Sequence, residues 1–163
     1  MRFIKLGLIS IVGLFVVIFL LSLLLPSRAI VSRAITINRP YDSVLAKLRD
    51  MREWEKWNLL LRDSSLSNKK FEANSFTATE MSVEMSGQDS TGLKTLWKRR
   101  GQDPVTSGLG VTAASSQTIV QWYFDFNVGW YPWEKFGSII FDKQLGPPME
   151  KSLDELKKLC ENN

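Results

Sequence analysis

The stretch TIVQWYFDFNV, Thr118–Val128, decides the fold of this chain. From Val120 onward its residues alternate strictly between two sides. One side carries Val120, Trp122, Phe124, Phe126 and Val128, and the other carries Gln121, Tyr123, Asp125 and Asn127. Side chains of a β-strand alternate with a period of two, so the pattern predicts a half-buried antiparallel strand, with one face on a core and the other in water.

The region before this stretch, from about residue 64, predicts further strands. It is rich in Ser, Thr, Gly and β-branched residues, and turn-forming sequences such as Gly87-Gln88-Asp89 interrupt it. These turns divide it into strands over Phe71–Thr79, Met81–Ser86, Leu93–Arg100 and Val105–Ala113. Short turns join antiparallel neighbours, so we expect a meander that ends with Thr118–Val128.

The residues before the meander predict a strand followed by two helices. Arg33–Asn38 is a short β-prone run, and Pro40 suits the first turn of a helix, where its missing N–H costs nothing. The apolar residues of this helix are Tyr41, Val44, Leu45 and Leu48. Asp50 then suits the N-cap of a second short helix, whose apolar residues are Met51, Trp54 and Trp57.

The residues after the meander predict a long C-terminal helix. Its apolar stripe consists of Trp133, Phe136, Ile140 and Phe141, then Met149, Leu153, Leu156 and Cys160. Gly146-Pro147-Pro148 predicts an interruption or kink, because a residue before proline avoids the α region. Only the sheet remains to cover this stripe, so we expect an α+β fold in which a curved sheet wraps the helix. Wherever the facing side chains leave space, a cavity forms between the two.

Two segments resemble a known superfamily. Arg33–Trp57 is similar to the opening of START-like, polyketide cyclase/dehydrase-type proteins (SRPBCC), with a strand, an Asn-x-Pro turn into a helix, and an Asp before two Trp three apart. Pro132–Leu156 resembles their C-terminal helix, with its Leu-Gly-Pro interruption. The middle of the domain matches only in strand content.

The resemblance implies a helix-grip fold whose members bind lipids, sterols, polyketides or other apolar ligands, while a minority catalyse reactions. A membrane-anchored bacterial subgroup carries a similar N-terminal hydrophobic segment that ends in Leu-Pro. Fold alone does not give function, so activity has to be argued from a site.

The N-terminus predicts a membrane anchor. Leu6–Leu25 is an uncharged run of 20 residues, which as a helix spans about 30 Å, the thickness of a bilayer core. We therefore expect a transmembrane anchor over residues 1–27 and one START-like domain over residues 28–163. A cleavable signal peptide is the alternative, since Ser27-Arg28-Ala29 has small residues at suitable positions, although signal peptides have shorter apolar regions.

The orientation of the anchor rests on few charges. Arg2 and Lys5 precede it, while Arg28, Arg33 and Arg39 follow it. A tail with two positive charges is hard to translocate. We expect a single-pass protein of the bacterial inner membrane, with its domain outside the cytoplasm.

Charge and composition exclude several functions. The chain has 21 basic and 17 acidic residues, and without Arg2 and Lys5 the balance is close to neutral, which does not favour nucleic acid as a partner. Lys98-Arg99-Arg100 is the one dense basic run, which is either a solvated strand end or a patch for a lipid headgroup or phosphate. The chain has no His and one Cys, Cys160, which excludes Ser-His-Asp and Cys-His catalysis and imidazole- or thiolate-based metal sites. We expect no cofactor and no metal.

Aromatic residues carry the binding hypothesis. Trp54 and Trp57 suit helix packing better than ligand contact. The predicted lining of a ligand cavity between sheet and helix is Trp97, Trp122, Phe124, Phe126, Phe136 and Ile140. Trp130, Tyr131 and Trp133 form a loop cluster that suits a membrane interface.

The sequence therefore favours a membrane-anchored, non-catalytic protein that binds a hydrophobic small molecule or a lipid. Two alternatives stay open: a tethered protein-interaction module with a filled core, and a cyclase- or dehydrase-type enzyme. The carboxylates available for catalysis are Glu84, Asp125, Glu134 and Asp142. None has a pattern that predicts burial, which a general acid or base needs, so no catalytic residue is predicted.

Overall fold

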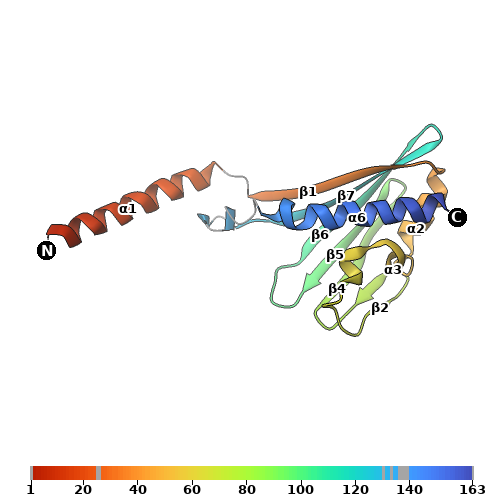
Figure 1. Ribbon diagram of the computed structural model, residues 1–163, viewed down its shortest axis with the longest axis horizontal. Helices are drawn as coiled ribbons and strands as arrows, with labels where there is room; N and C mark the ends of the chain where they lie inside the picture. The colour runs from red at the N-terminus through yellow and green to blue at the C-terminus, as the bar shows by residue number, and fades with distance from the viewer. Residues whose placement is uncertain (1, 25–26, 130, 133, 136–139, 163) are drawn as a thin grey trace.

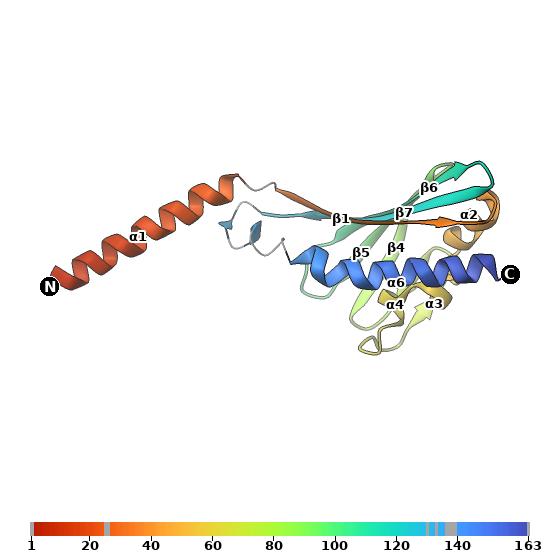
Figure 2. The same ribbon diagram turned by 45° about the horizontal axis from the view of Figure 1, so that its top comes forward.

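A computed structural model describes residues 2–24, 27–129, 131–132, 134–135 and 140–162. The described elements form an antiparallel sheet of seven strands, in the order β1-β7-β6-β5-β4-β3-β2. The helix α6 (Phe141–Glu161) lies along one face of this sheet, and the short helices α2 (Tyr41–Arg49), α3 (Trp54–Trp57) and α4 (Leu59–Arg62) lie beside it (Figures 1 and 2). The expected α+β helix-grip arrangement is confirmed.

The strand β7 (Gln117–Asn127) is the predicted half-buried strand. It pairs with β1 (Arg28–Ile37) on one side and with β6 (Val105–Ala114) on the other. Val120, Trp122 and Phe124 are buried on the face that carries α6, whereas Gln121 is exposed. The period of two thus separates core from solvent as expected.

The remaining strands differ from the prediction in their bounds. The expected strand Phe71–Thr79 is two strands, β2 (Lys70–Phe71) and β3 (Ser75–Thr77), because the Glu72 N–H bonds the Ser75 carbonyl at 2.8 Å and closes a turn. The other two strands are β4 (Met81–Asp89) and β5 (Gly92–Arg99). β1 begins five residues before the predicted Arg33.

The helices after β1 are also divided differently. Asp50 accepts a hydrogen bond from the Arg52 N–H at 3.0 Å, but this caps a turn, and helical structure begins only at Trp54. The sequence pattern did not predict α4. Asn58 caps it, because its side-chain oxygen accepts the Leu60 N–H at 3.1 Å.

The predicted interruption at Gly146-Pro147-Pro148 is wrong, since α6 runs through all three residues, whereas the alternative, a kink, stays a prediction. The clash that bars helix before proline involves the Cβ of the preceding residue, which Gly146 lacks. Proline has a helical φ, but it lacks an N–H donor and its ring crowds the carbonyl four residues earlier, so α6 continues here with fewer hydrogen bonds. Among the described residues α6 begins at Phe141, while Trp133 and Phe136 of the predicted stripe lie outside them.

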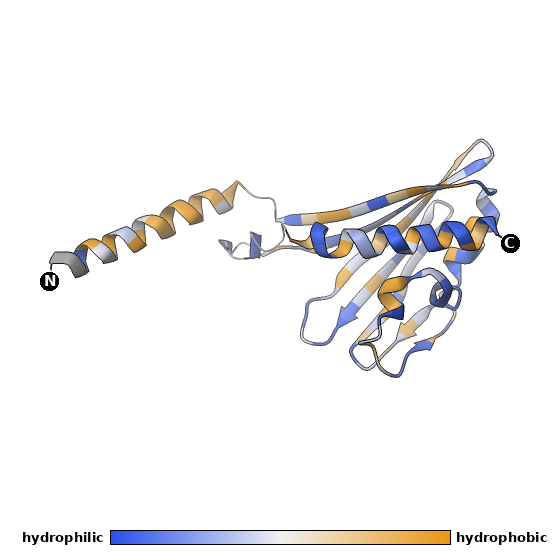
Figure 3. Cartoon of the chain, viewed as in Figure 1, coloured by the Kyte–Doolittle hydropathy of each residue, from blue (hydrophilic) through white to orange (hydrophobic). Residues whose placement is uncertain are grey.

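The N-terminal helix α1 (Arg2–Leu23) projects away from the sheet and is apolar along most of its length (Figure 3). Among the described residues it is the one helix long and apolar enough to cross a membrane, over Lys5–Leu23. A signal sequence near an N-terminus passes the same test.

Candidate ligand-binding site

A continuous row of aromatic rings lies between the sheet and the helices. Successive ring centroids lie 4.6–6.4 Å apart, within the range of favourable aromatic contact. In order along the row the rings belong to Trp54, Trp57, Trp122, Trp97, Phe124, Phe126 and Phe141. We call this set the aromatic row.

One end of the aromatic row is filled. Trp54, Trp57 and Trp122 are all fully buried, and we call them the closed end. The Trp54 indole N–H donates to the Leu48 carbonyl at 2.8 Å, and that of Trp122 donates to the Ser107 hydroxyl at 2.9 Å. These rings are core, as the packing interpretation of Trp54 and Trp57 predicted.

The other end of the row borders a cavity of about 160 Å³. We call it the open end. Its apolar lining consists of Trp97, Phe124 and Phe126 from the sheet, with Leu60, Met81, Val105 and Leu145. Its polar rim consists of Asp63, Lys98, Arg99, Gln102 and Asp103. An apolar interior with a polar rim is typical of a small-molecule site.

The structure divides the six predicted lining residues. Trp97, Phe124 and Phe126 line the cavity, and Trp122 lies behind them, with its ring 5.4 Å from that of Phe124. Ile140 is 50% exposed and is not among the residues that line this cavity. Phe136 lies outside the described residues, as do Trp130 and Trp133.

Leu145 and Leu60 were missing from the predicted lining. Leu145 lies one helical turn before Met149, so the stripe of α6 could have identified it had the helix been expected to continue there. Leu60 belongs to a helix of four residues, which is too short to show a periodic pattern.

Some charged side chains on the rim form ion pairs or hydrogen bonds within the protein, and others do not. The Lys98 ammonium lies 2.9 Å from Glu84, with which it forms an ion pair on the outer face of the sheet. Asp63 accepts the backbone N–H of Ser65 at 2.9 Å, and this bond lowers the pKa of its carboxyl, with smaller contributions from Lys69 and Arg99. In the part of the chain that the structure describes, neither the Arg99 guanidinium nor the Asp103 carboxylate forms a hydrogen bond or ion pair.

The carboxylates considered for catalysis lie at the surface. Three are paired: Glu84 with Lys98 at 2.9 Å, Asp142 with Arg33 at 2.9 Å, and Asp125 with Arg28 at 4.0 Å. Glu134 is exposed. Within the described ranges, no group of three His, Cys, Asp or Glu side chains is placed to hold a metal ion.

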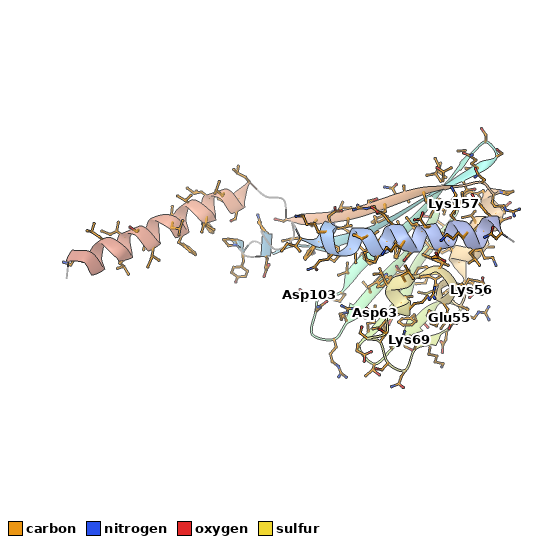
Figure 4. All side chains as sticks on the ribbon, viewed as in Figure 1. Glu55, Lys56, Asp63, Lys69, Asp103 and Lys157 are labelled. Atoms are coloured by element: carbon orange, nitrogen blue, oxygen red, sulfur yellow. The ribbon has the colours of Figure 1, made fainter. Side chains whose placement is uncertain are left out.

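The open end lies at the same end of the domain as the N-terminal helix. β1 begins at Arg28, only five residues after α1 ends, a separation of at most about 18 Å along the chain. Phe126 pairs with Ala29 in the sheet, and its ring lies 4.6 Å from that of Phe141 at the start of α6. Asp103 lies between β5 and β6 and Asp63 directly follows α4, and Figure 4 shows both below α6, with Asp103 nearer to the start of this helix.

Comparison with known proteins identifies the fold. No protein-family model and no curated protein matches the sequence. Among solved structures, the chain is similar to truncated norcoclaurine synthase from Thalictrum flavum, with a TM-score of 0.62 and 10% identity over 83% of this chain and 95% of that one. It is also similar to a START superfamily protein from Mycobacterium smegmatis, with a TM-score of 0.58 and 11% identity over 82% and 98%.

A third similar structure is CalU16 from Micromonospora echinospora, with a TM-score of 0.55 and 14% identity over 83% of this chain and 74% of that one. All three identities are too low to transfer an activity. These structural similarities establish that the domain has the START-like fold, which the segments Arg33–Trp57 and Pro132–Leu156 predicted.

Proposed function

We propose that this protein is a membrane-anchored binding protein that holds a hydrophobic small molecule or part of a lipid at the open end, without catalysing a reaction. The observation that carries the proposal is the cavity itself, whose walls are aromatic and aliphatic and whose rim is charged. Burial of apolar ligand surface there supplies the binding free energy, at about 25 cal/mol per Å².

The position of the N-terminal helix supports a membrane-bound role. In the proposed topology α1 crosses a bacterial inner membrane once, and the domain stands outside the cytoplasm. Because β1 starts close to the end of α1, the open end then lies near the bilayer surface. An apolar ligand reaches it from the membrane over a short path through water.

The ionisable groups support a role without catalysis. A general acid or base usually needs a carboxyl pKa raised by burial or by a like charge. Each described carboxyl group with a resolved shift has instead a lowered pKa, because hydrogen bonds or cations favour its charged form. Of these groups Asp63 lines the cavity, and its lowered pKa favours a charged carboxylate there, which suits binding better than proton transfer.

A cavity-filling variant tests the proposal. Val105 lines the cavity, while the next residue, Thr106, is exposed on the opposite face of β6. In nanodiscs of the full chain, Val105→Phe should weaken binding of fluorobenzene, followed by fluorine NMR, at least fivefold, and the matched Thr106→Phe should leave it unchanged. Equal binding by both variants would show that the probe sits elsewhere.

One observation favours a second function, a tethered protein-interaction module. The cavity of about 160 Å³ is smaller than the roughly 300–1,000 Å³ of common ligand sites, because the closed end is filled. Wild-type protein that binds neither fluorobenzene nor longer apolar probes would favour this function over ligand binding.

A further inference from the structure

The cavity is large enough for only one small apolar group. Its volume of about 160 Å³ is close to that of an engineered protein cavity of about 150 Å³ that binds benzene. A ring or a chain of about six carbons therefore fills the space between Trp97, Phe126 and Leu145. A larger ligand has to leave the rest of its structure at the rim or outside.

The rim offers unengaged groups of both signs. Lys98 is already paired with Glu84, so it offers little to a ligand. Arg99 belongs to the same face of β5 as Trp97, since the two are separated by one residue, and its guanidinium has five N–H donors. Asp103 and Asp63 also line the cavity, and carboxylate oxygens can accept hydrogen bonds from a cation, although Asp63 already accepts the Ser65 N–H.

Resting on the proposed function, we propose that the open end binds a small zwitterionic amphiphile. Its ring- or hexyl-sized apolar group lies against Trp97 and Phe126. Its acidic group, a carboxylate or phosphate, meets Arg99, and its ammonium group meets Asp103 and Asp63.

The mixture of charges selects this class over singly charged ligands. An arginine guanidinium matches the two oxygens of a carboxylate or phosphate. A purely anionic head would also face Asp63 and Asp103, and a purely cationic head would face Arg99. Only a headgroup with one positive and one negative charge can place each of its charges beside a rim residue of opposite charge.

Three probes with the same six-carbon chain test the inference. We would measure binding of hexylphosphoethanolamine, hexyl phosphate and hexylamine by calorimetry, using the full chain in phosphatidylglycerol nanodiscs, which contain no zwitterionic lipid. The cavity-filled Val105→Phe protein supplies the blank, because it keeps the rim and the bilayer but loses the apolar space.

The expected result is that wild type binds hexylphosphoethanolamine about fivefold more tightly than either singly charged probe, as for a partly exposed ion pair. In the Arg99→Gln protein, hexylphosphoethanolamine should bind no more tightly than hexylamine. In the Asp103→Asn protein, it should bind no more tightly than hexyl phosphate. Arg100→Gln is the matched control and should change nothing, since Arg100 does not line the cavity.

Equal affinity for the three probes would overturn this inference and leave the proposed function standing. The inference would also be overturned if the Arg99→Gln and Arg100→Gln proteins had the same affinity as each other for each of the three probes. If neither the hexyl probes nor fluorobenzene bind wild type, the proposed function fails, and the inference fails with it.

Discussion

The closed and open ends of the aromatic row are built from one strand but behave differently. Trp122 and Phe126 both point inward from β7 and are only four residues apart. Trp122 is covered by the ring of Trp57, and α3 and α4 pack against α6 at that end. At the cavity, by contrast, the helical layer contributes Leu60 of α4 and Leu145 of α6 to the lining. The extent of the helical layer, rather than the strand sequence, separates core from pocket.

Truncation at the closed end tests this difference with the largest expected effect. Trp122→Ala should lower the free energy of unfolding by about 3–5 kcal/mol, because it removes a fully buried ring and leaves a void that Trp57 and Trp97 cannot fill. Urea unfolding followed by circular dichroism measures this loss. A loss below about 1 kcal/mol would mean that the closed end is not close-packed.

Truncation at the open end should cost less. Phe126→Ala should lower the free energy of unfolding by about 2 kcal/mol, because its ring is only partly buried and already borders a cavity. The enlarged space should also shift the best alkyl probe from about six carbons to a longer chain. A chain-length series in the same binding assay checks this, and an unchanged optimum would separate Phe126 from the ligand site.

The sequence predicted the inward and outward faces of β7 but not the difference between its two ends. A period of two places Trp122 and Phe126 on the same face, and it contains no information about what covers them. That cover depends on α4, whose four residues show no periodicity, and on how far α6 extends. Three lining residues could therefore be named from β5 and β7, whereas Leu60 shows no periodic pattern and Leu145 could be named only if the helix was expected to run through the prolines.

The proline pair shows a second limit of local rules. Gly146-Pro147-Pro148 predicts a break, yet tertiary packing holds the segment in α6. A Cβ at Gly146 would overlap the guanidinium of Arg33, so the missing side chain makes room for a contact between helix and sheet. Local preference is overridden where such contacts stabilise the helix.

Two buried hydroxyl groups permit a finer comparison of the ends. The Ser107 hydroxyl accepts the Trp122 indole N–H at 2.9 Å, and the Thr95 hydroxyl accepts that of Trp97 at 3.0 Å. Ser107→Ala should cost about 1.5 kcal/mol, since it leaves a fully buried donor without a partner. Thr95→Val should cost less, about 1 kcal/mol, because water in the cavity can reach the Trp97 side chain.

Thermal unfolding of the two variants in parallel measures this difference. Each substitution removes one hydroxyl and keeps a similar volume, so each serves as the control for the other. A larger loss for Thr95→Val would mean that the Trp97 end is drier than the Trp122 end.

The smallest expected effect concerns how α6 is held over both ends. Arg33 of β1 binds Asp142 at 2.9 Å and Glu150 at 2.6 Å, on either side of the proline pair. Arg33→Ala should lower the free energy of unfolding by about 0.5–1 kcal/mol, as for other partly exposed ion pairs, and the difference from wild type should shrink at high salt. Lys157→Ala, whose ion pair with Glu161 lies at the far end of α6, is the control.

The pH dependence of stability distinguishes the Arg33–Asp142 ion pair from the Arg33–Glu150 ion pair. The hydrogen bond from Arg33 lowers the pKa of the Asp142 carboxyl in the folded state below its unfolded value of about 3.9. A carboxyl whose pKa is lower in the folded state than in the unfolded state stabilises the fold at pH values above the unfolded-state pKa. This contribution is lost as the pH falls through the folded-state pKa. The difference between wild type and Asp142→Asn should therefore be constant above about pH 5 and decline below about pH 4. If it persists undiminished at pH 2, Asp142 does not hold α6 through its charge, and packing of Leu145 and Phe141 on the sheet must close the open end by itself.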